Sequence, residues 1–194
     1  MIIVDVESSG IDSGKCSLLS VGAIDFDTPG RQFYEECRVF DGAHIEKEAL
    51  NVNGFTEEQA TDKNRQSDKE LIEKFLKWVE SVGEWTIAGQ NPSFDRDFLM
   101  KTAHRYHLNW PLAHRTLDLH SVAYMHMVKA KIEPPTTKNR SALNLDSITK
   151  YCGLDFERKK HNALEDTLLE AECFSRLMYN KKLLPEFEKF EIPF

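Results

Sequence analysis

Two acidic residues stand at the end of the first apolar segment of the chain. Residues 2–6 read Ile-Ile-Val-Asp-Val, so Asp5 interrupts an apolar run, and Glu7 follows two residues later. In an extended chain, residues two apart project from the same face, which points both carboxylates the same way. Burying a carboxylate is costly, and two neighbouring carboxylates repel each other unless a cation lies between them. Hard oxygen ligands of this kind suit Mg²⁺ or Mn²⁺, although an isolated Asp-x-Glu pair is equally explained by a solvated strand end.

A third carboxylate lies in the segment 91–95, which reads Asn-Pro-Ser-Phe-Asp. Asn91 is a preferred N-cap residue and Pro92 suits the first helical position, so we expect a helix to begin here. Asp95 then falls in the first turn of that helix, where the helix dipole favours a negative charge. Taken alone, the segment therefore indicates either a helix-stabilising aspartate or a further cation ligand.

An imidazole and a fourth carboxylate lie five residues apart, at His161 and Asp166. If Asn162 caps the following helix, His161 precedes the helix and can move, whereas Asp166 is fixed on it. A fixed carboxylate and a movable imidazole suit a metal ligand and a general base, respectively. A surface histidine before a capped helix explains this pair equally well when it is considered by itself.

The elements that must position these residues are strands first and helices later. Strands are expected over residues 1–6, 17–26 and 32–40, and the short turns between them indicate an antiparallel start to a sheet. A fourth strand is expected over 85–88. Helices then follow, so the order predicts an α/β fold with one mixed sheet covered by helices on both faces.

Capping boxes, one formed by Ser67 and Glu70 and one by Asn162 and Glu165, begin two of the helices. Apolar residues at helical spacing follow each box. Residues 130–140 contain two adjacent prolines and several basic residues, which is typical of an exposed loop. The expected helices span residues 67–82, 117–128, 143–152 and 163–178, with another beginning at 92.

Length and composition favour one intracellular globular domain. The chain has 194 residues, of which 41% are hydrophobic and 29% charged. Its four cysteines form no CxxC pair, which argues against a structural zinc site and for reduced thiols. Neither a membrane span nor a signal peptide is evident, so a cytoplasmic protein is expected. The net charge of −7 argues against non-specific duplex binding, which needs a broad basic surface.

Together, the three acidic segments resemble the motifs of the DEDDh branch of the DEDD superfamily of 3′→5′ exonucleases, which includes the proofreading subunit of bacterial replicative polymerase and ribonuclease T. The motifs D-x-E, N-x-x-F-D and H-x₄-D occur in the family's order, and residues 44–59 look like the segment that these enzymes carry before their first helix. The resemblance covers residues 1–178 and implies a ribonuclease-H-like three-layer fold. We expect residues 1–180 to form the exonuclease domain and 181–194 a tail that packs on it or flanks it. Ser8, Ser9 and Gln90 depart from the residues that the family often has.

The resemblance also implies the reaction. Two Mg²⁺ or Mn²⁺ ions would clamp the attacking and leaving oxygens, and His161 would take a proton from the attacking water. The products would be nucleoside 5′-monophosphates released from a 3′ end. The implied metal ligands are Asp5, Glu7, Asp95 and Asp166. The residues expected to contact substrate are Val6, Ser8, Ser9, Asn91 and Lys160. Basic residues at 129, 131, 138, 140 and 158–160 are expected either to contact phosphates 5′ of the cut or to be solvated.

Three other functions are compatible with the same architecture. A non-catalytic nucleic-acid-binding or polymerase-accessory module would be expected to lack one of the carboxylates or the histidine, and all are present. A ribonuclease-H-type endonuclease would cut a circular strand, and a phosphatase or nucleotidase would act on mononucleotides. The expected partner is the 3′ end of single-stranded DNA or RNA. No association with a membrane is expected. A second copy of the chain or a polymerase or repair protein is a further candidate.

Overall fold

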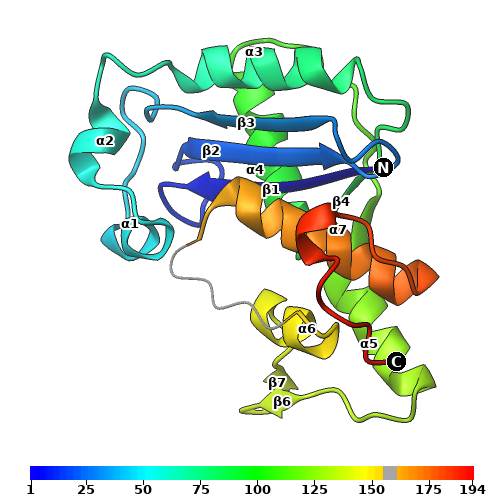
Figure 1. Ribbon diagram of the computed structural model, residues 1–194. Helices are drawn as coiled ribbons and strands as arrows, with labels where there is room; N and C mark the ends of the chain where they lie inside the picture. The colour runs from blue at the N-terminus through cyan, green and yellow to red at the C-terminus, as the bar shows by residue number, and fades with distance from the viewer. Residues whose placement is uncertain (155–160) are drawn as a thin grey trace.

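The first three strands form an antiparallel meander, as the sequence predicts (Figure 1). In the computed structural model, which describes residues 1–154 and 161–194, β1 (Ile2–Ser8) pairs with β2 (Leu18–Asp25), and β2 pairs with β3 (Gln32–Glu36). Two short parallel strands, β4 (Ile87–Gly89) and β5 (Thr116–Asp118), extend the sheet beyond β1. The mixed sheet therefore has the order β3-β2-β1-β4-β5.

One face of the sheet packs against α3 (Asp68–Val79) and α4 (Pro92–Arg105). Ile2, Val4 and Val6 of β1 belong to a buried cluster that includes side chains of both helices. In Figure 1, α4 crosses the sheet on its far side and α3 runs along the top of the molecule.

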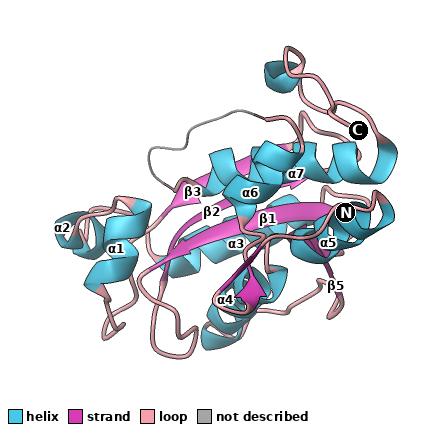
Figure 2. Ribbon diagram, turned by 90° about the horizontal axis from the view of Figure 1, so that it is seen from below, coloured by secondary structure: helices cyan, strands magenta, loops and turns pink. Residues whose placement is uncertain are grey.

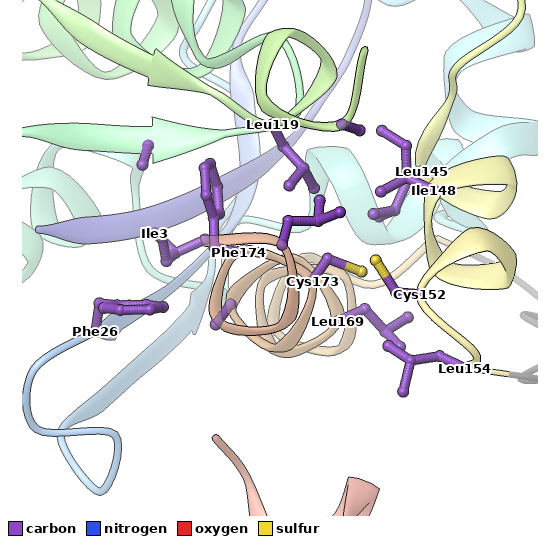
Figure 3. Close-up of a cluster of buried hydrophobic side chains, with 14 of the residues drawn as sticks. Ile3, Phe26, Leu119, Leu145, Ile148, Cys152, Leu154, Leu169, Cys173 and Phe174 are labelled. Carbon is purple, nitrogen blue, oxygen red and sulfur yellow. The ribbon is translucent and has the colours of Figure 1, made fainter. Parts of the chain in front are cut away.

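The opposite face packs against α7 (Ala163–Tyr179), which crosses the near side of the sheet in Figure 1. Ile3 of β1 belongs to the core cluster on this side, together with side chains of α5 (Leu119–Lys129) and α6 (Leu145–Tyr151). Figure 3 shows this cluster, in which Cys152 and Cys173 point toward one another. The helices on both faces confirm the predicted three-layer α/β fold.

Local sequence signals place several helix ends correctly. The Ser67–Glu70 capping box is complete at the start of α3, and Asn162 caps α7 by accepting hydrogen bonds from the N–H groups of Leu164 and Glu165. At α4 the helix begins at Pro92 as predicted, but Asn91 makes no side-chain cap bond. The reason is its left-handed backbone conformation (φ 59°), since an N-cap side chain reaches the first N–H groups from extended backbone.

Five short elements differ from the sequence prediction. The segment expected as an exposed loop contains the hairpin of β6 (Thr136–Thr137) and β7 (Arg140–Ser141). Residues 116–118 form the strand β5 rather than the start of a helix. The helix α5 begins only at Leu119, because Asp118 is its N-cap. Two helices that no periodic pattern predicted lie beyond one end of the sheet (Figure 2): α1 (Lys47–Asn53) and α2 (Glu57–Thr61).

The C-terminal residues return to the α7 side of the molecule. A 3₁₀ turn, η1 (Pro185–Phe187), buries Phe187 in the core cluster of α5, α6 and α7, and Phe190 and Phe194 pack against that cluster. All four cysteines are buried and free. Among residues 1–154 and 161–194, no helix combines the length and apolarity that crossing a membrane requires.

Candidate active site

Asp5 and Glu7 lie on the face of the sheet that α7 covers. They share the side of β1 that carries Ile3, because side chains alternate along a strand. Glu7 is buried, whereas Asp5 is partly exposed.

A glycine opposite Asp5 allows α7 to approach the sheet closely. Gly22 of β2 pairs with Asp5, and a methyl group on Gly22 would fall 2.2 Å from the carbonyl oxygen of Ala163, the first residue of α7. Thr167 also fixes this approach, because its hydroxyl donates to the Gly22 carbonyl at 3.1 Å. The first turn of α7, which carries Asp166, is therefore held directly over the acidic end of β1.

Asp95 reaches the same end of β1 from the first turn of α4. Its Oδ1 accepts the backbone N–H of Val6 at 3.0 Å. The residue is buried, with 3% of its surface exposed. Burial raises the pKa of Asp95 from 3.8 to about 7, although the Val6 N–H opposes this shift by stabilising the carboxylate. Burial thus outweighs the hydrogen bond.

His161 and Asp166 complete the cluster. The Nδ1 atom of His161 lies 3.5 Å from Oδ2 of Asp166, and the His161 side chain is 46% exposed while that of Asp166 is buried. Glu7, His161 and Asp166 each offer one potential ligand atom, and these atoms all lie within 4.8 Å of one another. One side of the His161 ring therefore faces the carboxylates, and the rest of the ring is accessible to solvent.

The cluster concentrates negative charge. The pKa of Asp5 is raised well above 3.8, first because the surrounding protein removes much of the water around its carboxyl group, and then by the charges of Asp95, Glu170, Glu7 and Asp166. Carboxylates that raise one another's pKa in this way are stabilised by a cation that binds among them. Hard carboxylate oxygens form a donor set that fits Mg²⁺ or Mn²⁺.

A pocket of 390 Å³ opens over this cluster. Three of the residues expected to contact substrate, Val6, Ser8 and Asn91, line it together with Asp5, Glu7, Asp95 and His161. Ser9 does not line it: the Ser9 hydroxyl is buried, donates to the His44 carbonyl and accepts the Ser17 N–H. Ser9 is therefore placed to support the loop after β1 rather than to touch a ligand. Lys160 and the neighbouring Arg158 and Lys159 lie outside the described residues.

Comparisons with known proteins identify the family of this chain. The family model RNase_T, described as "Exonuclease", matches residues 2–174. The chain belongs to this exonuclease family. The predicted membership of the DEDD superfamily is thereby confirmed, and the protein is a nuclease that acts on nucleic acid.

Curated relatives of this exonuclease are distant but extensive matches. Ribonuclease T of Vibrio campbellii is 25% identical, with 94% of this chain and 87% of the relative covered. Exonuclease DPD1, chloroplastic/mitochondrial, of Arabidopsis thaliana is 24% identical, with 94% and 57% covered.

Solved structures share the fold of this exonuclease. The nuclease domain of 3′hExo, a DEDDh family member bound to rAMP, superposes with a TM-score of 0.69 at 15% identity, over 94% of this chain and 93% of that one. Escherichia coli exonuclease I in complex with a dA16 oligonucleotide gives a TM-score of 0.72 at 18% identity. That match covers 93% of this chain and 40% of exonuclease I.

Residues that the sequence did not single out also shape the pocket of this exonuclease. The buried Asn53 of α1 donates from Nδ2 to the Ser8 carbonyl at 3.1 Å, and Glu46, which precedes α1, lines the pocket. Glu170 is a buried carboxylate whose charge acts on Asp5, and its Oε1 accepts the backbone N–H of Gln90 at 3.2 Å. Its spacing from Asp166 was the available signal, because residues four apart share one face of a helix.

Glu170→Gln is expected to stabilise the metal-free exonuclease. Glutamine keeps an oxygen acceptor for the Gln90 N–H and removes one of the charges that repel Asp5. We expect the free energy of unfolding to rise by about 1 kcal/mol near neutral pH, and Tm by about 2–4 °C. Thermal unfolding in EDTA measures this, with the exposed Glu165→Gln of the same helix as control. A lower Tm for Glu170→Gln would mean that the charged hydrogen bond to Gln90 outweighs the repulsion.

Proposed function

We propose that this nuclease is a metal-dependent 3′→5′ exonuclease that removes nucleoside 5′-monophosphates from single-stranded DNA or RNA. The observation that carries the proposal is the meeting of four carboxylates and one half-exposed imidazole: Asp5, Glu7, Asp95 and His161 line one pocket. The fourth carboxylate, Asp166, lies 3.5 Å from His161. The carboxylates come from β1, α4 and α7, and the family to which the chain belongs is described as exonuclease.

Asp5, Glu7, Asp95 and Asp166 would hold two divalent cations. Bound there, such ions supply charge stabilisation at the scissile phosphate and lower the barrier by several kcal/mol. Four carboxylates against two divalent ions balance in charge, which reconciles an acidic pocket with an anionic substrate.

His161 would act as the general base. Its Nδ1 faces Asp166, which orients the ring, and this leaves Nε2 to accept the proton of the attacking water. Because His161 precedes α7 and its side chain is half-exposed, the ring can approach the water as the substrate binds.

Cleavage at a strand end is favoured by the far wall of the pocket. Val52 and Asn53 of α1 line it beyond the end of β1, together with Glu46. A volume of 390 Å³ is in the range of single-ligand pockets, which suits one terminal nucleotide better than a continuous strand. Val6, Ser8 and Asn91 would contact that nucleotide, and Lys160 stays a predicted substrate contact.

A 5′-labelled oligonucleotide assay tests the proposal. With Mg²⁺ or Mn²⁺ we expect a ladder that shortens from the 3′ end and nucleoside 5′-monophosphate as product. EDTA and Asp5→Ala should each abolish shortening, whereas Asp41→Ala, at an 81% exposed carboxylate that does not line the pocket, should not. DNA and RNA run side by side identify the preferred sugar.

Two further substrates separate the competing functions. Cleavage of a circular single strand would replace the proposal with an endonuclease, and phosphate release from mononucleotides would replace it with a phosphatase. Absence of all three activities in the wild-type protein would favour a binding or polymerase-accessory module.

The proposed setting is the cytoplasm, as the cysteine content of the sequence favours. A second copy of the chain or a polymerase or repair protein is the proposed protein partner. Cell fractionation tests the proposed location. Gel filtration with light scattering measures the mass of the assembly and so tests for a protein partner.

A further inference from the structure

We propose that the start of α5 and the β6–β7 hairpin bind the single strand upstream of its cleaved end. This upstream surface consists of His120, Tyr124, Lys138 and Arg140. The inference rests on the exonuclease function proposed above and extends it, because it assigns a second binding region outside the pocket. Its occupant is the part of a DNA or RNA strand that lies 5′ of the terminal nucleotide.

Hydrogen bonds fix this surface relative to the mouth of the pocket. Gln90 and Asn91 both line the pocket. Gln90 donates from Nε2 to the Leu143 carbonyl, two residues after β7, at 3.0 Å. The Asn91 N–H donates to Oδ1 of Asp118, the residue that caps α5, at 3.2 Å. A strand that leaves the pocket over Gln90 and Asn91 therefore meets α5 and the hairpin next.

The hairpin and α5 are also bonded to each other. Nε2 of His120, in the first turn of α5, lies 2.8 Å from the hydroxyl of Ser141 in β7. The hairpin turn itself is tight, because Lys138 and Asn139 both adopt left-handed backbone conformations. Figure 1 shows the hairpin next to α6, away from the central sheet. The surface is thus a defined structure rather than a loose loop.

The charge of this region is opposite to that of the whole chain. Residues 129–140 contain four basic residues and one acidic residue, in a chain of net charge −7. Lys138 and Arg140 are exposed on the hairpin. Phosphates are repelled by the acidic pocket unless cations occupy it, so basic residues just outside the pocket would hold the uncleaved part of the strand.

Tyr124 offers a ring face that the fold itself does not need. Its side chain is 45% exposed, and its ring centroid lies 6.3 Å from that of His120, one helical turn earlier. The buried Ala123 and Met127 attach this part of α5 to the core, so packing does not explain an exposed tyrosine here. Exposed aromatic rings next to basic residues are the usual means of stacking unpaired bases without sequence preference.

Binding is best measured without cleavage, in the Asp166→Asn background with Mg²⁺, by fluorescence anisotropy of labelled 12-nucleotide DNA and RNA. Lys138→Asn, which tolerates the left-handed backbone, is combined with Arg140→Ser. We expect the double variant to raise Kd about tenfold or more and to reduce the slope of log K against log salt by about 1.4, the value for two lost single-strand phosphate contacts. Lys69→Ala with Lys77→Ala on α3 is the charge-matched control and should change neither quantity.

Tyr124→Ala has a different expected signature. Loss of one stacked base should raise Kd about tenfold and leave the salt slope unchanged. Tyr179→Ala, a 54% exposed tyrosine at the end of α7, is the control. In the active enzyme, the same variants should raise KM for the 12-nucleotide strand and leave hydrolysis of a dinucleotide unchanged.

Failure of this inference and failure of the proposed function are distinguishable. If the wild-type protein shortens strands and the upstream variants bind and cleave as it does, the upstream surface has no role and only this inference falls. If the wild-type protein neither binds nor shortens either strand, both proposals fall.

Discussion

Asp95→Asn is expected to lower the rate of strand shortening by about 10³-fold or more while making the metal-free protein more stable. Asparagine still accepts the Val6 N–H but loses the negative charge that a divalent cation requires. A catalytic cation contributes several kcal/mol to the barrier, and about 4 kcal/mol corresponds to roughly a thousandfold. Steady-state cleavage of a labelled strand measures the loss.

The stability gain follows from the raised pKa of Asp95. The carboxyl ionises near pH 3.8 when unfolded and at about 7 when folded, so its ionisation opposes folding. The contribution of Asp95 to stability is therefore greatest below its unfolded pKa and is lost as pH rises toward about 7, by up to roughly 4 kcal/mol. Asparagine does not titrate, so the Tm of Asp95→Asn in EDTA should exceed that of the wild type by several degrees above about pH 7 and fall less between about pH 4 and 7.

Added metal should reverse the order of the two Tm values, so that the wild type becomes more stable than Asp95→Asn. Mg²⁺ or Mn²⁺ should raise the Tm of the wild type, because a ligand that binds only the folded state stabilises it, and should raise that of Asp95→Asn much less. Asp97→Asn, two residues further along α4 and 43% exposed, is the control and should change neither activity nor the metal response. Full activity of Asp95→Asn, or a lower Tm in EDTA, would contradict this account.

Arg176→Met is expected to destabilise the protein by about 3–5 kcal/mol, because it removes one partner of a buried ion pair. Nε of Arg176 donates to Glu172 at 2.7 Å, and both side chains are fully buried. The guanidinium also donates to the carbonyls of Cys152, Phe187, Phe190 and Glu191. Glu172 in turn accepts the N–H groups of Leu183 and Leu184.

This network ties the C-terminal residues and the end of α6 to α7, so its loss should free the tail. We expect Tm to fall by roughly 6–20 °C and a protease to cleave after residue 180 much faster than in the wild type. Arg176→Lys keeps the positive charge but not the planar set of donors, so its Tm should lie between those of the wild type and Arg176→Met. Arg115→Met, at an exposed arginine, should change the free energy of unfolding by no more than about 0.5 kcal/mol. A wild-type Tm for Arg176→Met would show that the tail is held by its phenylalanines instead.

Helices and strands with long apolar patterns or clear caps were predictable from sequence. The meander of β1, β2 and β3, the capping box of α3 and the cap of α7 follow from local residue types. Short elements were missed: α1, α2, β5 and the β6–β7 hairpin are each too short for a periodic pattern, although the Thr56–Gln59 capping box was a local signal for α2. They form because other parts of the chain supply their contacts, as Leu50 of α1 shows by packing with Leu19 of β2.

Buried charges were the second class of feature that sequence reading missed. Glu170, Glu172 and Arg176 lie within one helix, where charged residues are normally solvated. Only their tertiary partners distinguish them: the Gln90 backbone for Glu170, and the tail for the Glu172–Arg176 pair.

Residue types and their local spacing specify which groups the exonuclease has available and how each is held within its own segment. The two-residue period of β1 directs Asp5 and Glu7 to one face, and Asn162 leaves His161 outside the helix that carries Asp166. Packing between distant segments brings these groups together, since Gly22 has no side chain to keep the first turn of α7 away from β1. The same packing lets Asp95 join them through the Val6 N–H, whereas the Ser9 hydroxyl donates to the His44 carbonyl instead. Local signals depend on neighbours in the chain, whereas convergence of distant segments depends on packing that no single segment encodes.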